Sequence, residues 1–176
     1  MKYVIFFSII SVIVIYIFIF GLRNDPKLVP SNLINEVVPN FELVKINEKN
    51  INFFGREDII SKNEIKIINF FASWCLPCKI EHPQLKAMSK KNLLFGVNKK
   101  DRKDDLIAWL EEMGDPFEAI GADPTGQESI KWGVYGIPET FILDKDSKIR
   151  YRHVGPIMAK DLVKLNNILE FSKKLN

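Results

Sequence analysis

The feature that most constrains the fold is a pair of cysteines, Cys75 and Cys78, in the sequence Cys-Leu-Pro-Cys. They are the only cysteines in the chain, which excludes a small scaffold held together by several disulfides. The apolar run at residues 65–71 predicts a strand buried on both faces. Residues 79–90 predict a helix. The order of strand, cysteine pair and helix therefore predicts that the pair lies where a sheet-packed helix begins.

This position suits thiol–disulfide exchange, which needs a reactive thiolate and a second thiol to resolve the mixed disulfide. Free N–H groups and the dipole at a helix N-terminus lower a thiol pKa from about 8.5 to roughly 3.5–7.5. We therefore predict that Cys75 is the nucleophile and that Cys78, one turn further on, is the resolving thiol. Pro77 fits the first turn, where its missing N–H costs little.

A half zinc site and a structural disulfide are the alternatives for the cysteine pair. A zinc site needs further ligands, and the chain has only two histidines, His82 and His153. We expect both histidines to be surface or hydrogen-bonded side chains. We therefore predict a redox pair with no metal and no cofactor.

The N-terminal segment differs from the rest of the chain because residues 3–22 contain no charged side chain. Twenty helical residues span about 30 Å, the thickness of the hydrocarbon core of a bilayer. A core helix in so small a domain is rarely apolar all round, and a cleaved signal has a shorter apolar region and a small-residue cut site. We predict a membrane anchor at residues 1–22, a tether at 23–38 and one folded domain at 39–176.

The remaining patterns predict an α/β domain with a mixed sheet flanked by helices. Alternation around a polar turn predicts a β-hairpin at residues 40–54. Residues 58–61 predict a helical turn. Further strands are expected at 93–98, 117–121, 139–143 and 148–153, the last two forming a hairpin, and further helices at 104–113, 125–132 and 161–175.

Two features beside the cysteines are candidates for substrate contact. Trp74 directly precedes Cys75 and is either a platform for the substrate or a packing residue; we expect it to be partly exposed. Ile137 and Pro138 precede the predicted strand at 139–143. Pro138 is either a strand-start proline or a cis proline packed against the cysteines, which would free the backbone before it to pair with an extended substrate.

The chain has a formal net charge of +3, but it contains no basic block and no basic stretch interleaved with aromatic residues. We therefore expect no nucleic-acid partner.

Taken together, these residues resemble the thioredoxin superfamily, and within it the thiol:disulfide interchange proteins of cytochrome c maturation (the CcmG/DsbE group). Pro-Glu-Thr-Phe at 138–141 and Tyr-Arg-His-Val-Gly-Pro at 151–156 are the discriminating stretches. Six residues before the first cysteine, general thioredoxins have a buried aspartate. This group has Asn at that position, and Asn69 therefore fits it. Further matching stretches are 39–43, 69–78, 81–83, 96–98 with 100–101, and 123–126.

The resemblance implies a thioredoxin-like three-layer fold on an inner-membrane anchor, with the domain in the bacterial periplasm. The substrate would be apocytochrome c or a partner thiol protein of the maturation pathway, and a membrane thiol reductant would supply electrons. It further implies that Pro138 is cis and that Glu81 and Glu139 lie near the cysteines. A nearby carboxylate disfavours the thiolate form of a cysteine. A less stabilised thiolate makes the cysteine pair a better reductant. Because Asn69 cannot accept a proton, Glu139 is our candidate base.

Two other functions compete with a reductant for cytochrome c maturation. A general periplasmic thiol reductase or an oxidase would use the same cysteines, and an oxidase would need a strongly lowered Cys75 pKa. A Cu(I)-handling module would use both thiolates as soft ligands, although Met88 is the only methionine near the motif.

Overall fold

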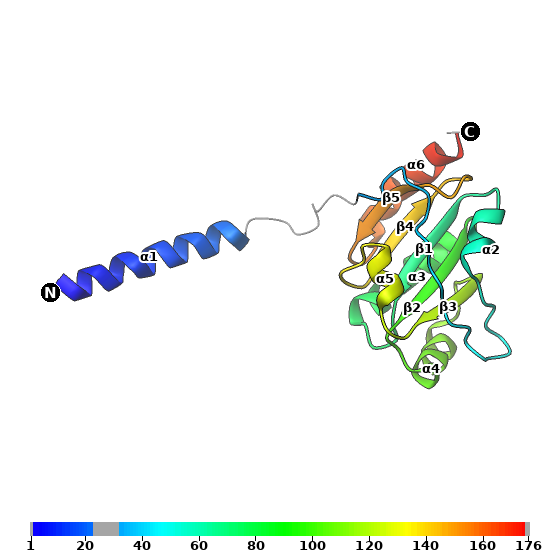
Figure 1. Cartoon of the computed structure of the whole chain (residues 1–176), viewed down its shortest axis with the longest axis horizontal. Helices are drawn as coiled ribbons and strands as arrows, with labels where there is room; N and C mark the ends of the chain where they lie inside the picture. The colour runs from blue at the N-terminus through cyan, green and yellow to red at the C-terminus, as the bar shows by residue number, and fades with distance from the viewer. Residues whose placement is uncertain (1, 23–31, 175–176) are drawn as a thin grey trace. The chain divides into compact units, whose positions relative to one another are not determined.

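The computed structural model describes residues 2–22 and 32–174 and divides into two compact units. The N-terminal unit contains the helix α1 (Lys2–Leu22), and the larger unit contains all the other helices and strands (Figure 1). Residues Lys2–Gly21 of α1 have a mean hydropathy of 2.9, and none of them is buried. The helix is therefore long and apolar enough to cross a bilayer, by length and composition.

The larger unit is built on a five-stranded mixed sheet in the order β3-β2-β1-β4-β5. β1 pairs in parallel with β2 and antiparallel with β4, and the remaining pairs are β2 with β3 (parallel) and β4 with β5 (antiparallel). The strands are β1 (Lys66–Phe71), β2 (Leu93–Lys99), β3 (Ala119–Asp123), β4 (Glu139–Leu143) and β5 (Ile149–Val154). Every residue of β1 is buried, as its continuous apolar run predicts for a central strand.

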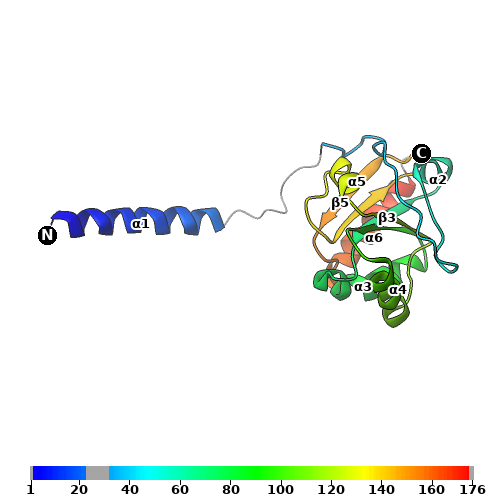
Figure 2. The same cartoon turned by 60° about the horizontal axis from the view of Figure 1, so that its bottom comes forward.

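Helices cover both faces of this sheet, so the predicted three-layer fold is confirmed. Leu85, Leu106 and Leu165 belong to one apolar core, which places their helices on one face (Figure 2). Ile59 and Trp132 belong to the core of the opposite face. The face with Leu85, Leu106 and Leu165 is covered by α3 (Leu76–Ser89), α4 (Lys103–Met113) and α6 (Leu162–Lys173). The opposite face is covered by α2 (Arg56–Ser61) and α5 (Gln127–Lys131). A short 3-10 helix, Ala159–Asp161, precedes α6.

The predicted β-hairpin at residues 40–54 is wrong. The segment makes no strand with itself and instead runs along the edge strand β3. Val44 and Ala122 exchange backbone hydrogen bonds of 2.8 and 2.9 Å, and the N–H of Ile120 donates to the Asn52 carbonyl at 2.8 Å. Within the segment Phe41, Ile46 and Ile51 are buried, and because they lie five residues apart the burial does not alternate as it would in a hairpin strand.

Of the tether expected at residues 23–38, residues 23–31 lie outside the described residues, and residues 33–38 pack against the domain. The Asn35 N–H donates to the Ile149 carbonyl at 2.7 Å, and the Val38 N–H donates to the Ser147 carbonyl at 3.0 Å. Val38 is buried, and Leu33 packs against the same core. Residues 33–38 therefore pair with the turn before β5 and with its first residue, Ile149, and cover that end of the sheet edge.

Candidate active site

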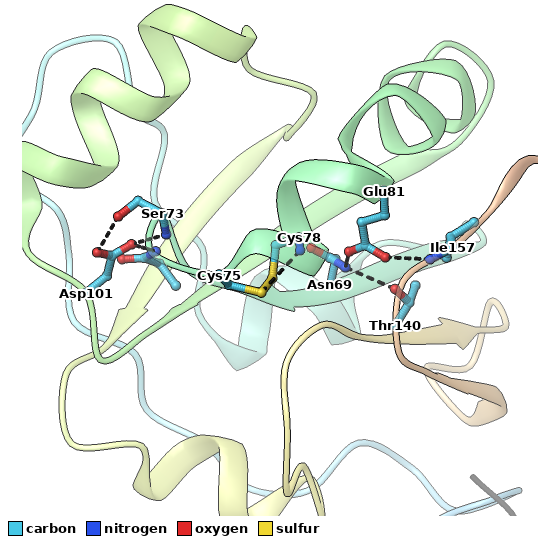
Figure 3. The surroundings of a disulfide bond; sticks show 9 residues. Asn69, Ser73, Cys75, Cys78, Glu81, Asp101, Thr140 and Ile157 are labelled. Carbon is cyan, nitrogen blue, oxygen red and sulfur yellow. Dashed lines mark hydrogen bonds between the residues drawn. A yellow bond between two sulfur atoms is a disulfide. The ribbon is translucent and has the colours of Figure 1, made fainter. Parts of the chain in front are cut away.

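The two cysteines form a disulfide at the point where β1 passes into α3 (Figure 3). Cys75 is the N-cap residue of α3, and its Sγ accepts a hydrogen bond from the Cys78 N–H at 3.2 Å. Pro77 lies in the first turn, as predicted. Cys75 is 4% exposed and Cys78 1% exposed. At the helix N-terminus the Cys78 N–H therefore points at the Cys75 sulfur, an arrangement that stabilises a thiolate.

Trp74 extends from the surface beside this disulfide, as expected for a platform. Its side chain is 62% exposed, and its indole N–H donates to the Lys100 carbonyl at 3.1 Å. The neighbouring Asp101 binds Ser73, the residue before Trp74. Lys100 and Asp101 were not among the predicted site residues, although both lie in a stretch that carries the family resemblance.

The Ile137–Pro138 peptide bond is cis, as the resemblance implied. Ile137 packs against the core that contains both cysteines. The Pro138 carbonyl accepts from the Gly155 N–H at 3.0 Å, whereas no hydrogen bond between described residues uses the backbone of Ile137. The backbone before Pro138 is thus free to pair with an extended chain.

Glu81 lies one turn after Cys78 on the same face of α3 and is completely buried. Its Oε1 accepts from Asn69 Nδ2 at 2.8 Å, and its Oε2 accepts from the Ile157 N–H at 2.9 Å (Figure 3). Burial raises the pKa of Glu81 to about 7, and these two hydrogen bonds oppose the rise. A carboxyl group that changes charge near neutral pH therefore lies beside the redox pair.

Glu139 is also buried, but the structure does not bring its carboxylate to the cysteines. Thr140 accepts from Asn69, which faces α3 and Glu81, so alternation along β4 directs Glu139 to the opposite face. There its Oε2 accepts from Arg152 Nε at 2.7 Å, and its Oε1 accepts from the N–H groups of Tyr135 and Gly136 at 3.2 and 3.3 Å. The prediction that Glu139 is the base is corrected because an ion pair on the other face occupies this carboxylate.

The histidines are hydrogen-bonded side chains, as expected. The His82 ring is buried edge-on to Trp109, and its Nε2 lies 2.8 Å from the Gly114 carbonyl. Burial lowers the pKa of His82, and because a carbonyl only accepts, Nε2 is the protonated nitrogen. His153 Nε2 lies 3.4 Å from the Pro156 carbonyl. Among residues 2–22 and 32–174, no cluster of three or more His, Cys, Asp or Glu could hold a metal.

Comparison with known proteins agrees with this geometry. Residues 34–152 match the model of the AhpC/TSA family. The chain is 39% identical over 140 residues to the thiol:disulfide interchange protein DsbE homolog of Paracoccus denitrificans, covering 80% of this chain and 76% of the relative. It is 36% identical over 135 residues to DsbE of Escherichia coli, covering 76% and 72%.

The chain belongs to the DsbE family of thiol:disulfide interchange proteins.

A crystal structure described as DsbE from Chlorobium tepidum superposes with a TM-score of 0.65 at 25% identity, covering 79% of this chain and 96% of that one. The DsbE-family chain is thus a thiol–disulfide oxidoreductase with a thioredoxin-like fold, and Cys75 and Cys78 are its Cys-x-x-Cys pair.

The stability of this DsbE-family protein should depend on pH through Glu81. Its folded pKa of about 7 lies above the ordinary value of 4.5, so its stabilising contribution is complete below 4.5 and is lost as pH rises through 7. The ionised group then costs about 3 kcal/mol, since one pKa unit corresponds to about 1.4 kcal/mol. We expect Glu81→Gln to remove most of this loss. Urea unfolding from pH 4.5 to pH 8 measures it.

The amide of Glu81→Gln can be accommodated because Asn69 Oδ1 is buried without a hydrogen-bond partner and becomes an acceptor when the Asn69 amide turns over. Glu112→Gln, at an exposed position on α4, is the matched control and should leave the pH dependence unchanged. Parallel pH curves for the wild type and Glu81→Gln would contradict the raised pKa of Glu81 in the folded protein.

Proposed function

We propose that this protein is a membrane-anchored periplasmic reductant that keeps the cysteines of apocytochrome c, or of a partner thiol protein, reduced during cytochrome c maturation. The observation that supports this direction of electron flow is the buried Glu81 one turn from Cys78, with its pKa raised by burial to about 7. Related proteins of the family are named thiol:disulfide interchange proteins.

The reaction balances as a two-electron exchange between the cysteine pair and a substrate disulfide. The Cys75 thiolate attacks one substrate sulfur, forms a mixed disulfide and expels the other substrate sulfur as a thiolate. Cys78 then loses its proton and attacks Cys75 Sγ, which releases the second substrate thiolate and closes the Cys75–Cys78 disulfide. The substrate gains two electrons and two protons, and a membrane thiol reductant returns the pair to the dithiol.

Glu81 tunes this pair in the proposed mechanism. When it is ionised, its charge disfavours a second negative charge on the neighbouring cysteine and opposes the effect of the helix N-terminus. A thiolate that is less stabilised makes the dithiol a better electron donor. Among the two glutamates selected from the sequence, Glu81 takes this role because the Glu139 carboxylate is paired with Arg152.

The substrate chain would lie between Trp74 and the Ile137–Pro138 segment. Trp74 offers an exposed apolar ring, and the unused backbone groups of Ile137 can form main-chain hydrogen bonds with an extended segment. This mode of binding recognises the backbone around a substrate cysteine and requires no particular charge on the substrate side chains.

We propose that α1 spans the inner membrane and holds the domain in the periplasm, where its electron donor is also anchored. Its length, its mean hydropathy of 2.9 and its lack of acidic or basic residues after Lys2 support this role. A reductant in an oxidising compartment needs a continuous supply of electrons, which a membrane thiol reductant provides.

A complementation experiment tests the proposed function. In a strain that lacks its own family member, the wild-type chain should restore haem-containing c-type cytochromes, and Cys75→Ser should not. Lys174→Gln, an exposed change remote from the pair, is the control and should complement fully. Normal cytochrome assembly with Cys75→Ser would refute the role in maturation.

Electron flow is tested separately by the equilibrium reduction potential of the full chain in a glutathione or dithiothreitol buffer. A potential of about −200 mV or lower supports a reductant, whereas a value near about −120 mV is that of a strong oxidant. The second result would reverse the proposed direction and leave the exchange chemistry in place.

A further inference from the structure

Asp101, in the turn after β2, uses both carboxylate oxygens to bind a segment distant in sequence. Oδ2 accepts from the Ser73 N–H at 2.6 Å, and Oδ1 accepts from the Ser73 hydroxyl at 2.7 Å (Figure 3). Its other donors belong to its own turn: Asn98 Nδ2 at 2.8 Å and the Arg102 N–H at 3.0 Å. One side chain therefore joins the turn at residues 98–102 to the loop that leads into the cysteine pair.

A second bond from the same turn reaches the next residue of that loop. The Lys100 carbonyl accepts the Trp74 indole N–H at 3.1 Å. Lys100 has a φ of 50°, a left-handed conformation that is uncommon for a residue with a Cβ. The turn thus binds Ser73 through the Asp101 carboxylate and Trp74 through the Lys100 carbonyl. Ser73 and Trp74 are the two residues that precede Cys75.

These bonds hold an aromatic ring that the core does not hold. Trp74 is 62% exposed, whereas Trp109 and Trp132 are 3% and 1% exposed and are fixed by packing. An exposed side chain keeps much of its rotamer freedom and loses it when a partner binds. Fixing the ring in advance lowers that cost, which is how preorganisation increases affinity.

We propose that Asp101 is a positioning residue for exchange with polypeptide substrates. It acts through Ser73 to hold Trp74 as a flat apolar platform for a side chain next to the substrate cysteine. The proposal rests on the proposed function only in that Trp74 contacts the substrate. It assigns no chemistry to Asp101, because the carboxylate binds the loop before Cys75 and not the sulfur atoms.

The test compares Asp101→Asn with wild type in the full chain. With a disulfide-bonded peptide as substrate, we expect KM to rise about tenfold, the scale of losing one charge-assisted hydrogen bond, with little change in kcat. With a small-molecule disulfide, which does not reach the platform, the rate should stay unchanged. The reduction potential should also stay unchanged. Asp104→Asn, an exposed change three residues away, is the matched control.

Indole fluorescence provides a readout that does not depend on activity. Because the other two tryptophans are buried, quenching by acrylamide reports mainly on Trp74. Asp101→Asn should increase the mobility and the quenching of this ring, and Asp104→Asn should not. Unchanged quenching in Asp101→Asn would overturn the proposal, whether or not the wild type reduces the peptide.

A double-mutant cycle separates positioning from general support of the fold. If Asp101 acts through the ring, Trp74→Ala should raise KM for the peptide, and adding Asp101→Asn should raise it little further. Additive effects of the two substitutions would overturn the proposal. So would an equal loss of rate with peptide and small-molecule disulfides or a shifted potential, because either would show that Asp101 supports the cysteines themselves. A wild type inactive on both substrates would instead refute the proposed function.

Discussion

Cys78→Ser is expected to leave the protein joined to its substrate by a stable mixed disulfide, whereas Cys75→Ser is expected to abolish exchange. Cys75 lies at the helix N-terminus, where its sulfur accepts the Cys78 N–H, so it is the sulfur whose thiolate the helix stabilises. Serine at position 75 lowers the exchange rate on the order of a thousandfold or more, as loss of a nucleophile does in other enzymes.

The measurement follows the reduced full-length variants after mixing with a disulfide-bonded peptide. Non-reducing electrophoresis and mass spectrometry detect the mixed disulfide, and thiol alkylation detects unreacted cysteine. The double variant Cys75→Ser/Cys78→Ser is the control for adsorption of the peptide. If Cys75→Ser accumulated the mixed disulfide and Cys78→Ser did not, the assignment of attacking and resolving cysteines would be reversed.

Arg152→Ala is expected to destabilise the domain by about 3–5 kcal/mol, the cost of leaving a buried charge without its partner. The Glu139 side chain is completely buried, that of Arg152 is 7% exposed, and the two groups lie 2.7 Å apart. Arg152 Nη2 also donates to the Gly133 carbonyl at 2.8 Å, and its guanidinium lies over the Tyr135 ring at 4.9 Å. Removing it therefore loosens the loop that leads to the cis proline.

The matched control for Arg152→Ala is Arg102→Ala. Arg102 also pairs with a carboxylate, but its side chain is 79% exposed and that of its partner Asp105 is 54% exposed. An exposed pair of this kind contributes about 0–1 kcal/mol. Urea unfolding of both variants compares the two pairs directly. Equal costs would show that the Arg152–Glu139 pair does not hold this part of the fold.

A double variant separates the unpaired charge from lost packing. Arg152→Met/Glu139→Gln removes both charges and retains similar volumes, so it should be more stable than Arg152→Ala. If the double variant were as unstable as Arg152→Ala, the hydrogen bond to Gly133 and the ring contacts of Arg152, rather than the charge on Glu139, would account for the loss.

Most of the sheet and the position of the cysteines could be predicted from local sequence patterns. The continuous apolar run at Lys66–Phe71 identified the central strand, and the alternation on either side of residues 144–147 identified the β4–β5 hairpin. The helix after the cysteines begins at Leu76 rather than at residue 79, because Cys75 itself caps it. In each case the deciding residues are neighbours in the chain.

The predictions that needed correction depend on contacts between distant segments. The pattern at residues 40–54 predicted strands that pair with each other, whereas Val44 pairs with Ala122 of β3, 78 residues later. Glu81 and Glu139 are both buried glutamates next to functional residues. They lie on opposite faces of the sheet, and this follows only from the way β4 pairs with β1. In the sequence Asp101 cannot be distinguished from other polar turn residues, because its contact with Ser73 forms only in the folded structure.

The sequence by itself therefore determined the redox pair, its place at a helix N-terminus, the mixed sheet and an apolar N-terminal helix long enough to cross a bilayer. These follow from spacing and periodicity, which bonded neighbours set. The tertiary structure decided which carboxyl group lies beside the cysteines, which one is neutralised by an arginine, and which turn holds Trp74. Burial and charge pairing depend on groups that approach only when distant segments pack, so no local pattern could contain them.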